Sequence, residues 1–323
     1  MSKFIGRLAD FGIAKEAVRG TAETAATFYV PKSSISLDDE VEKFVDESSI
    51  GVVEDSQESV NVKKVAVGEV EGKIGDKSIG LVLLSALGSV STSGPSDSAY
   101  SHVFSVLQSA QKPSLTFFLE DLNQDYKYAN GMIGELAISV VLKSYAMFRA
   151  SFRAKKGASA TLTPSYSAES HFLPKHGTFK IASAQSGLSG ASASNIRRID
   201  INISNNLEDD DAIGSEDPVD ILAKQFSISG SLEFVYDSEA IKTLMLANSP
   251  QALRIELNNT DVLIGSSSTP KLTIDLHSVK FSNFKRSYGN NDIVLATVDF
   301  KGHYKIADSK AITITLVNAQ ASY

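Results

Sequence analysis

The chain has 323 residues, of which 42% are hydrophobic and 21% charged, so it is long enough for two domains with hydrophobic cores of ordinary size. The formal net charge of −7 disfavours a protein that binds nucleic acid through a basic surface. The chain contains no cysteine, which excludes disulfides, thiolate chemistry and cysteine-ligated zinc sites.

One helix is predicted in the first half of the chain. Residues 79–90 form an apolar run, with Asp76 or Ser78 as the N-cap and Gly88 directly after the expected last residue, Leu87. A bilayer span needs about twenty residues, so this run is too short and we expect a buried helix without membrane insertion.

The rest of the first half is predicted to be antiparallel β-structure. Apolar and polar residues alternate in residues 135–142 and 147–154, as in half-buried strands. The serine-rich segment 88–98 is expected to be a loop that is mobile before assembly. A second, short helix is expected within residues 98–111, ended by Pro113.

The second half repeats the same order of elements: strand, strand, helix, strand, strand, strand. Its helix is expected to begin after Asp237 or Ser238 and to end at about Ala247. Three of the predicted correspondences place residues 65–74 over 226–235, 134–143 over 270–280, and 151–156 over 299–304.

The fold class predicted from this repeat is mainly β, with two tandem β-sandwich or half-barrel domains, each flanked by one α-helix. The first domain is assigned to residues 1–157 with an N-terminal arm, and the second to residues 178–323. Residues 158–177 are small, polar and contain prolines, as in a linker between domains.

No catalytic constellation emerges from the sequence, so we predict neither an enzyme nor a cofactor or metal site. The five histidines form no His-Glu-x-x-His motif, and His171 and His176, which are nearest in sequence, lie in the expected linker. His277 is interpreted as an ordinary strand position. A β-sandwich hydrolase is also disfavoured, because no pair of positioned catalytic groups is recognisable.

The densest acidic segment is residues 205–218. Its carboxylates do not have the spacing of a calcium loop, so a solvated hairpin or assembly loop is favoured over a cation site. Arg197 and Arg198 either pair with this segment across subunits or lie on an exposed strand edge. The residues predicted to form an inter-subunit loop are Asn205, Asn206, Glu208, Asp209, Asp210 and Asp211.

Two β-domains with long loops and no active site present strand edges that an isolated protein must protect. We expect a protein of this kind to use the edges to join copies of itself, and head-to-tail contacts close into rings when the rotation permits. The alternative is a ligand-binding β-sandwich, for example a carbohydrate-binding or adhesin-like module of a phage or bacterial surface structure. The absence of tryptophan weakens this alternative, because such sites usually need aromatic platforms.

Several short phrases resemble the tail tube (major tail) proteins of long-tailed bacteriophages. Such proteins commonly begin with a Lys-Glu-x-x-x-Gly-Thr-Ala phrase, which this chain has at Lys15, Glu16, Gly20, Thr21 and Ala22. Later phrases of the family match the segments 205–208, 214–218 and 230–232. The first half departs from the family, because it lacks the Asn-Asn-Leu-Glu phrase.

The resemblance implies that each domain is a sandwich of two crossed sheets flanked by a helix, with a long hairpin or loop for stacking. Rings of six such domains would stack into a hollow tube, the conduit for DNA delivery into the host. With two domains per chain, we expect a trimer with pseudo-sixfold symmetry rather than a hexamer.

The expected partners are other copies of this chain, together with tail-tip, tail-terminator and tape-measure proteins. Double-stranded DNA would pass non-specifically through the lumen, whose wall we expect to be negatively charged. The expected location is the virion tail, after assembly in the bacterial host cytoplasm.

Overall fold

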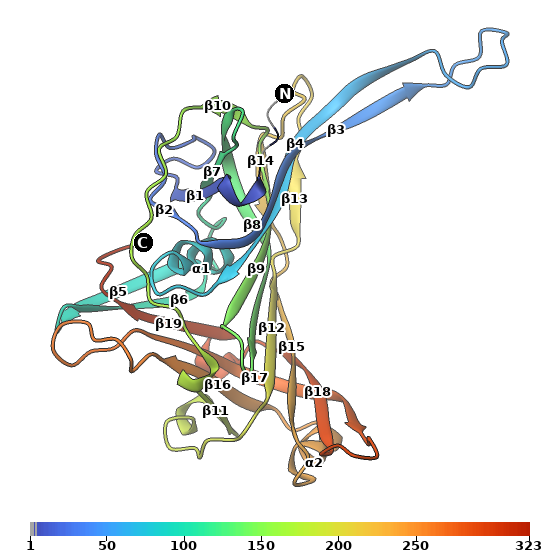
Figure 1. The fold of residues 1–323 in the computed structure, drawn as a ribbon. Helices are drawn as coiled ribbons and strands as arrows, with labels where there is room; N and C mark the ends of the chain where they lie inside the picture. Colours follow the sequence, from blue (N-terminus) through green and yellow to red (C-terminus); the bar gives the residue numbers. More distant parts are fainter. Residues whose placement is uncertain (1–2, 4) are drawn as a thin grey trace.

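The computed structural model describes Lys3 and residues 5–323, and these residues are mainly β-structure (Figure 1). The two α-helices are α1 (Ile79–Leu87) and α2 (Ala240–Leu246). The strands up to residue 160 are β1 (Asp10–Lys15), β2 (Phe28–Tyr29), β3 (Lys32–Asp46), β4 (Glu58–Lys73), β5 (Gly88–Ser96), β6 (Ala99–Val106), β7 (Leu115–Glu120), β8 (Asp125–Val141), β9 (Met147–Ala154) and β10 (Ala158–Ala160). The remaining strands are β11 (Gly177–Ala182), β12 (Arg198–Ser204), β13 (Leu207–Asp210), β14 (Asp220–Ala223), β15 (Ser227–Val235), β16 (Gln251–Asn258), β17 (Lys271–Ser287), β18 (Leu295–Gly302) and β19 (Ile312–Asn318).

The two halves of the chain pair their strands in the same order. In the first half the neighbours run β1–β7–β8–β9–β4–β3, and in the second half they run β11–β16–β17–β18–β15–β12. All of these pairs are antiparallel. The predicted mainly β fold class with a repeated sandwich unit is confirmed.

The register of the repeat is marked by a glycine opposite a phenylalanine. Phe152 pairs with Gly68, and Phe300 pairs with Gly230. An added Cβ would lie 2.5 Å from the Phe152 ring in the first pair and 2.3 Å from the Phe300 ring in the second. Each glycine therefore makes room for the ring opposite it, and the two pairs occupy equivalent places.

These pairs test the predicted correspondences. The match of residues 151–156 with 299–304 has the right register. The match of 65–74 with 226–235 is wrong by one residue, since Gly68 corresponds to Gly230. The match of 134–143 with 270–280 is wrong, because residues 132–139 of β8 correspond to residues 280–287 of β17. Alternation repeats every two residues, so it leaves such shifts undetermined.

The halves are joined through shared strands and a shared core. β12 of the second half pairs with the C-terminal part of β8, and β19 pairs with β6. The buried apolar residues of both halves form one contiguous cluster. Residues 158–177, the predicted linker, run along the molecule between the halves and contact the first half through β10 and a bridge between Gly75 and His171 (Figure 1). The division into two domains stays a prediction.

Helix α1 confirms the predicted buried helix. All of its residues are buried, and its last residue, Leu87, is followed by Gly88, whose φ of 95° is readily adopted only by glycine. The short helix expected within residues 98–111 is wrong, because residues 99–106 form β6, paired on both sides. The segment 88–98 is likewise β5 of a hairpin rather than a free loop. β6 pairs with the distant strand β19, and β5 pairs with β6, so a contact far along the chain supports the conformation of both, which local sequence does not reveal.

Candidate assembly interface

Glu16 organises the loop that follows β1. Its carboxylate is buried and accepts hydrogen bonds from the backbone N–H of Gly20 at 2.7 Å and of Asn130 at 2.7 Å. The hydroxyls of Ser114 and Thr116 also donate to it. A carboxylate that accepts several hydrogen bonds at once holds its surroundings in one arrangement. This contact gives a physical reason for the glutamate of the Lys-Glu-x-x-x-Gly-Thr-Ala phrase.

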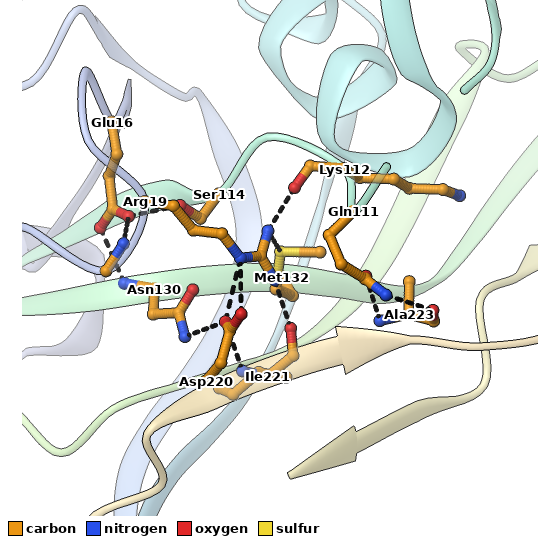
Figure 2. A network of polar contacts seen from close by, with 11 residues as sticks. Glu16, Arg19, Gln111, Lys112, Ser114, Asn130, Met132, Asp220, Ile221 and Ala223 are labelled. Atoms are coloured by element: carbon orange, nitrogen blue, oxygen red, sulfur yellow. Dashed lines mark hydrogen bonds and ion pairs between the residues drawn. The ribbon is translucent and has the colours of Figure 1, made fainter. Parts of the chain in front are cut away.

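The same loop places Arg19 against the second half of the chain (Figure 2). The Arg19 Nε donates to both carboxylate oxygens of Asp220, at 3.0 and 2.9 Å, and one terminal nitrogen donates to the Ile221 carbonyl at 2.6 Å. Asn130 Nδ2 donates to Asp220 at 2.8 Å. Burial alone would raise the pKa of Asp220, but hydrogen bonds from Arg19 and Asn130 hold it below its usual value.

Asp220 and Ile221 lie in β14, so this cluster clamps the β13–β14 hairpin to the first half. None of the three residues Arg19, Asn130 and Asp220 was predicted as a site residue from the sequence. Arg19 lies inside the Lys-Glu-x-x-x-Gly-Thr-Ala phrase, and that position was the available signal. Asp220 and Asn130 carry no comparable signal, because only the folded chain brings them to Arg19.

Arg19→Met is expected to free the hairpin. The variant leaves the carboxylate of Asp220 without its guanidinium partner and should lower the free energy of unfolding by about 1–3 kcal/mol. Hydrogen exchange should become faster in residues 207–223, as measured by mass spectrometry. Arg149→Met is the matched control, because the Arg149 side chain is 62% exposed in its pair with Glu69 and exposed pairs contribute about 0–1 kcal/mol. Unchanged exchange in the hairpin of the Arg19 variant would contradict the clamp.

Asn205, one of the residues of the predicted inter-subunit loop, is buried within the single chain. It is 1% exposed, and its Nδ2 donates to the carbonyls of Ala86 at 3.2 Å and Ile133 at 2.7 Å. Its Oδ1 accepts from the buried Lys112 ammonium. Asn205 therefore anchors the base of the hairpin against the last turn of α1.

The other residues of the predicted loop lie on or beside β13. Asn206 is exposed with a φ of 46°, and Asp210 is exposed. The Asp209 side chain is 3% exposed and forms ion pairs with Lys63 at 2.9 Å and Arg153 at 2.6 Å. Further ion pairs join Asp211 to Lys63 at 2.6 Å and Glu208 to Lys224 at 2.6 Å. Much of the acidic charge is thus neutralised within the chain, and the role of these residues between subunits stays a prediction.

The joint between the two halves is an antiparallel strand pair. β12 and β8 pair from Arg198 opposite Val141 to Ser204 opposite Glu135. The Ser139 hydroxyl donates to Asp200, which lies directly opposite, at 2.6 Å. Arg198 forms an ion pair with Asp200 at 2.5 Å within its own strand, and no pair between Arg197 or Arg198 and the acidic segment is found in the described residues.

Two strand edges have no strand paired with them in the described residues. β3 pairs only with β4, and residues 280–287 of β17 pair only with β18. By the order of the strands, β3 is the equivalent of β12, and the free part of β17 is the equivalent of the part of β8 that pairs with β12. The edges of β8 and β12 pair with each other within the chain. The equivalent edges, on β17 and β3, are each left without a paired strand.

The outer parts of β3 and β4 form an arm that projects from the body of the molecule (Figure 1). We define this arm as residues 41–62. It carries several exposed apolar side chains, and a group of exposed apolar side chains usually marks a surface that binds a partner. They are Val41, Phe44, Val45, Ile50, Val52, Val53, Val60 and Val62.

The model of the family described as phage tail tube protein matches residues 6–302. The chain belongs to the phage tail tube protein family. It is therefore a structural protein of the phage tail tube, as the resemblance predicted.

Comparisons with individual proteins add little to the family assignment. A solved structure that the tail tube chain resembles is described as a crystal structure of Hcp protein. It shares 12% sequence identity and a TM-score of 0.22, over 42% of the tail tube chain and 96% of that chain. A comparison with curated protein sequences gives no match.

Two histidines of the tail tube chain, His277 and His102, make contacts that hold the fold together. The His277 imidazole lies 2.9 Å from Asp308 and 3.0 Å from Thr313, and so joins β17 to β19 and to the turn before it. His102 is buried between Thr92, Asn318 and the Gln320 carbonyl, and burial lowers its pKa. Within the residues described, no group of three or more His, Asp or Glu side chains is placed to hold a metal ion. No helix in this part of the chain has the length and hydropathy to cross a membrane.

Proposed function

We propose that copies of this chain join edge to edge into rings, and that the rings stack into the hollow tail tube through which phage DNA is delivered to the host. The observation that carries the proposal is the pair of free edges on β3 and β17. A chain that already joins its two halves through the equivalent strands has the same joint available to further copies, head to tail. Ring closure pairs every edge, which removes the exposed backbone groups.

Three chains per ring are proposed, with their six similar halves arranged in pseudo-sixfold symmetry. The support is the close likeness of the halves. Both keep the strand order, the glycine–phenylalanine pair and an irregularity in the long strand at its pairing with β9 or β18. If the second half only decorated the outside of a hexamer, nothing would require it to keep the edge that joins neighbouring chains within a ring.

The arm is proposed to make contacts between stacked rings, because its apolar side chains need a partner that the isolated chain does not supply. Tail-tip, tail-terminator and tape-measure proteins are the further partners proposed for the finished tail. The protein would assemble in the host cytoplasm and remain in the virion.

DNA is proposed to slide through the lumen without being held. Binding to DNA strengthens with each phosphate that Lys or Arg neutralises, so the wall of a conduit needs few Lys and Arg side chains that are not already in ion pairs. The net charge of −7 supports this, as do the ion pairs of two arginines of β9. Arg149 lies 2.6 Å from Glu69, and Arg153 lies 2.6 Å from Asp209.

The proposal is tested by electron microscopy and mass measurement of the purified chain. We expect rings or tubes in negative stain, and a smallest closed particle of three times the 34.6 kDa chain mass. A matched variant replaces residues 44–60 by Asn-Gly, a favoured two-residue hairpin turn, between the paired Lys43 and Asn61. This variant should form rings that do not stack. Monomers alone, at every protein concentration and with tail-tip protein added, would contradict the proposal.

A further inference from the structure

We infer that the free edge of β17 binds the β3 edge of a second copy of this chain, in the register that β8 and β12 use within one chain. The inference rests on the proposed function and adds the residues that meet. A single chain supplies the template, because its own two halves are already joined in this way.

The template is a well-formed antiparallel joint. The paired residues of β12 and β8 run from Arg198 opposite Val141 to Ser204 opposite Glu135. Backbone hydrogen bonds continue the joint at both ends, from Leu142 N to the Arg197 carbonyl at 3.1 Å and from Asn205 N to the Gly134 carbonyl at 2.8 Å.

The pairing partners determine which residues of the free edges are equivalent to the template. In β3, Leu37 lies opposite Gly68, as Ile201 of β12 lies opposite Gly230. In β17, Phe281 lies opposite Phe300, as Ile133 of β8 lies opposite Phe152. Beyond these positions β8 and β17 each contain one extra residue relative to the strand they pair with. The residues of the two strands therefore stay equivalent after this point.

Transferring the template places Ser36 of one copy opposite Ser287 of the next, and Asp38 opposite Lys285. These are the equivalents of Asp200 opposite Ser139 and of Asn202 opposite Ala137. All four side chains of the transferred pairs are exposed in the single chain. Opposite charges directly across an antiparallel joint stabilise it, and like charges destabilise it.

The charges around the two edges are complementary over a wider area. The β3 edge carries Asp38, Glu40 and Glu42, and the second half carries Lys280, Lys285 and Lys301 beside its free edge. No ion pair of the described residues uses any of these six side chains.

Lys301 has a particular parallel in the template. It is the equivalent of Arg153, since each follows the phenylalanine that faces a glycine. Arg153 binds Asp209 of the hairpin that follows β12. The arm that follows β3 in the next copy is thus expected to bring acidic side chains to Lys301.

Disulfide cross-linking tests the register directly, because the natural chain has no cysteine. The test variant is Ser36→Cys with Ser287→Cys in the full chain. The internal control, Asp200→Cys with Ser139→Cys, places the same equivalent pair inside one chain. The shifted control, Ser36→Cys with Arg286→Cys, places the two thiols on opposite faces. The single variants control for random collisions.

Mild oxidation should link the test variant into dimers and trimers on a non-reducing gel, with the ladder ending at three. Its yield should exceed that of the shifted control by about tenfold, because directly opposed Cβ atoms lie about 4.5–5.5 Å apart and a disulfide needs nearly that distance. As a second measurement, Lys285→Glu and Asp38→Lys should each lower the yield of rings severalfold, and the double variant should restore it.

The outcomes separate the register from the function. Rings in the microscope without a cross-link in the test variant, while the internal control oxidises, would overturn the proposed joint and leave the tube function standing. A cross-link in the shifted control instead would also overturn the register. If the protein forms neither rings nor cross-links, both the proposed joint and the proposed function are overturned.

Discussion

Phe152→Ala is expected to lower the free energy of unfolding by about 3–5 kcal/mol, the usual cost of removing a buried phenylalanine ring. The Phe152 side chain is 3% exposed, and its ring centroid lies 5.7 Å from that of Phe11 and 4.4 Å from that of Phe117. The ring also covers Gly68, which has no side chain to fill the space. Urea unfolding followed by circular dichroism measures the loss.

Two further variants serve as comparisons for the loss of stability in Phe152→Ala. Phe300→Ala removes the equivalent ring of the second half and should cost about as much, within the range for buried phenylalanine. Phe44→Ala removes a ring that is 64% exposed on the arm and should change stability by no more than about 0.5 kcal/mol. If Phe152→Ala and Phe44→Ala unfolded at the same urea concentration, the proposed core of the repeat would be wrong.

Raising the pH from 8 to 10 is expected to add about 2 kcal/mol to the free energy of unfolding through Lys112. Lys112 is 5% exposed, and burial lowers its pKa to about 8. In the unfolded chain the pKa returns to about 10.4. Between these values the unfolded chain holds a proton that the folded chain has released, so stability rises with pH. Below pH 8 both states are protonated and the contribution of Lys112 no longer changes.

Lys112→Met should remove this rise while filling similar space. Lys43→Met, at an exposed position of the arm, should keep it. The measurement is urea unfolding at four pH values from 7 to 10. Burial raises the pKa of Tyr128, Tyr166 and Tyr323 in the folded chain, so their unfolded forms ionise first and lower stability from about pH 9 upward. The contribution of Lys112 is therefore the difference in pH dependence between the natural chain and the Lys112 variant. An equal pH dependence in the Lys112 variant and the natural chain would contradict the assignment.

The contacts of the candidate assembly interface could be predicted only in part from the sequence. The acidic segment was predicted to be an inter-subunit loop from the density of its charged residues. The structure shows that Asn205 is buried beneath α1 and that Asp209 is paired with Lys63 and Arg153. Arg19 lies 201 residues from Asp220 in the sequence, and no local sequence pattern predicts a contact over that separation.

The sequence by itself determined the class of the fold and the kind of protein. Period-two alternation identified strands, and an apolar run ending before Gly88 identified the helix, because burial of one face is a local property of each segment. The family phrases, which hold tight turns such as that at Gly20, were also readable without coordinates.

Only the tertiary structure decided which strand lies beside which, and in what register. Alternation states which face of a strand is buried, but the free energy that selects a neighbour comes from contacts with segments far away in the chain. The pairing of β8 with β12, the sheet position of residues 99–106 and the two free edges all depend on such contacts.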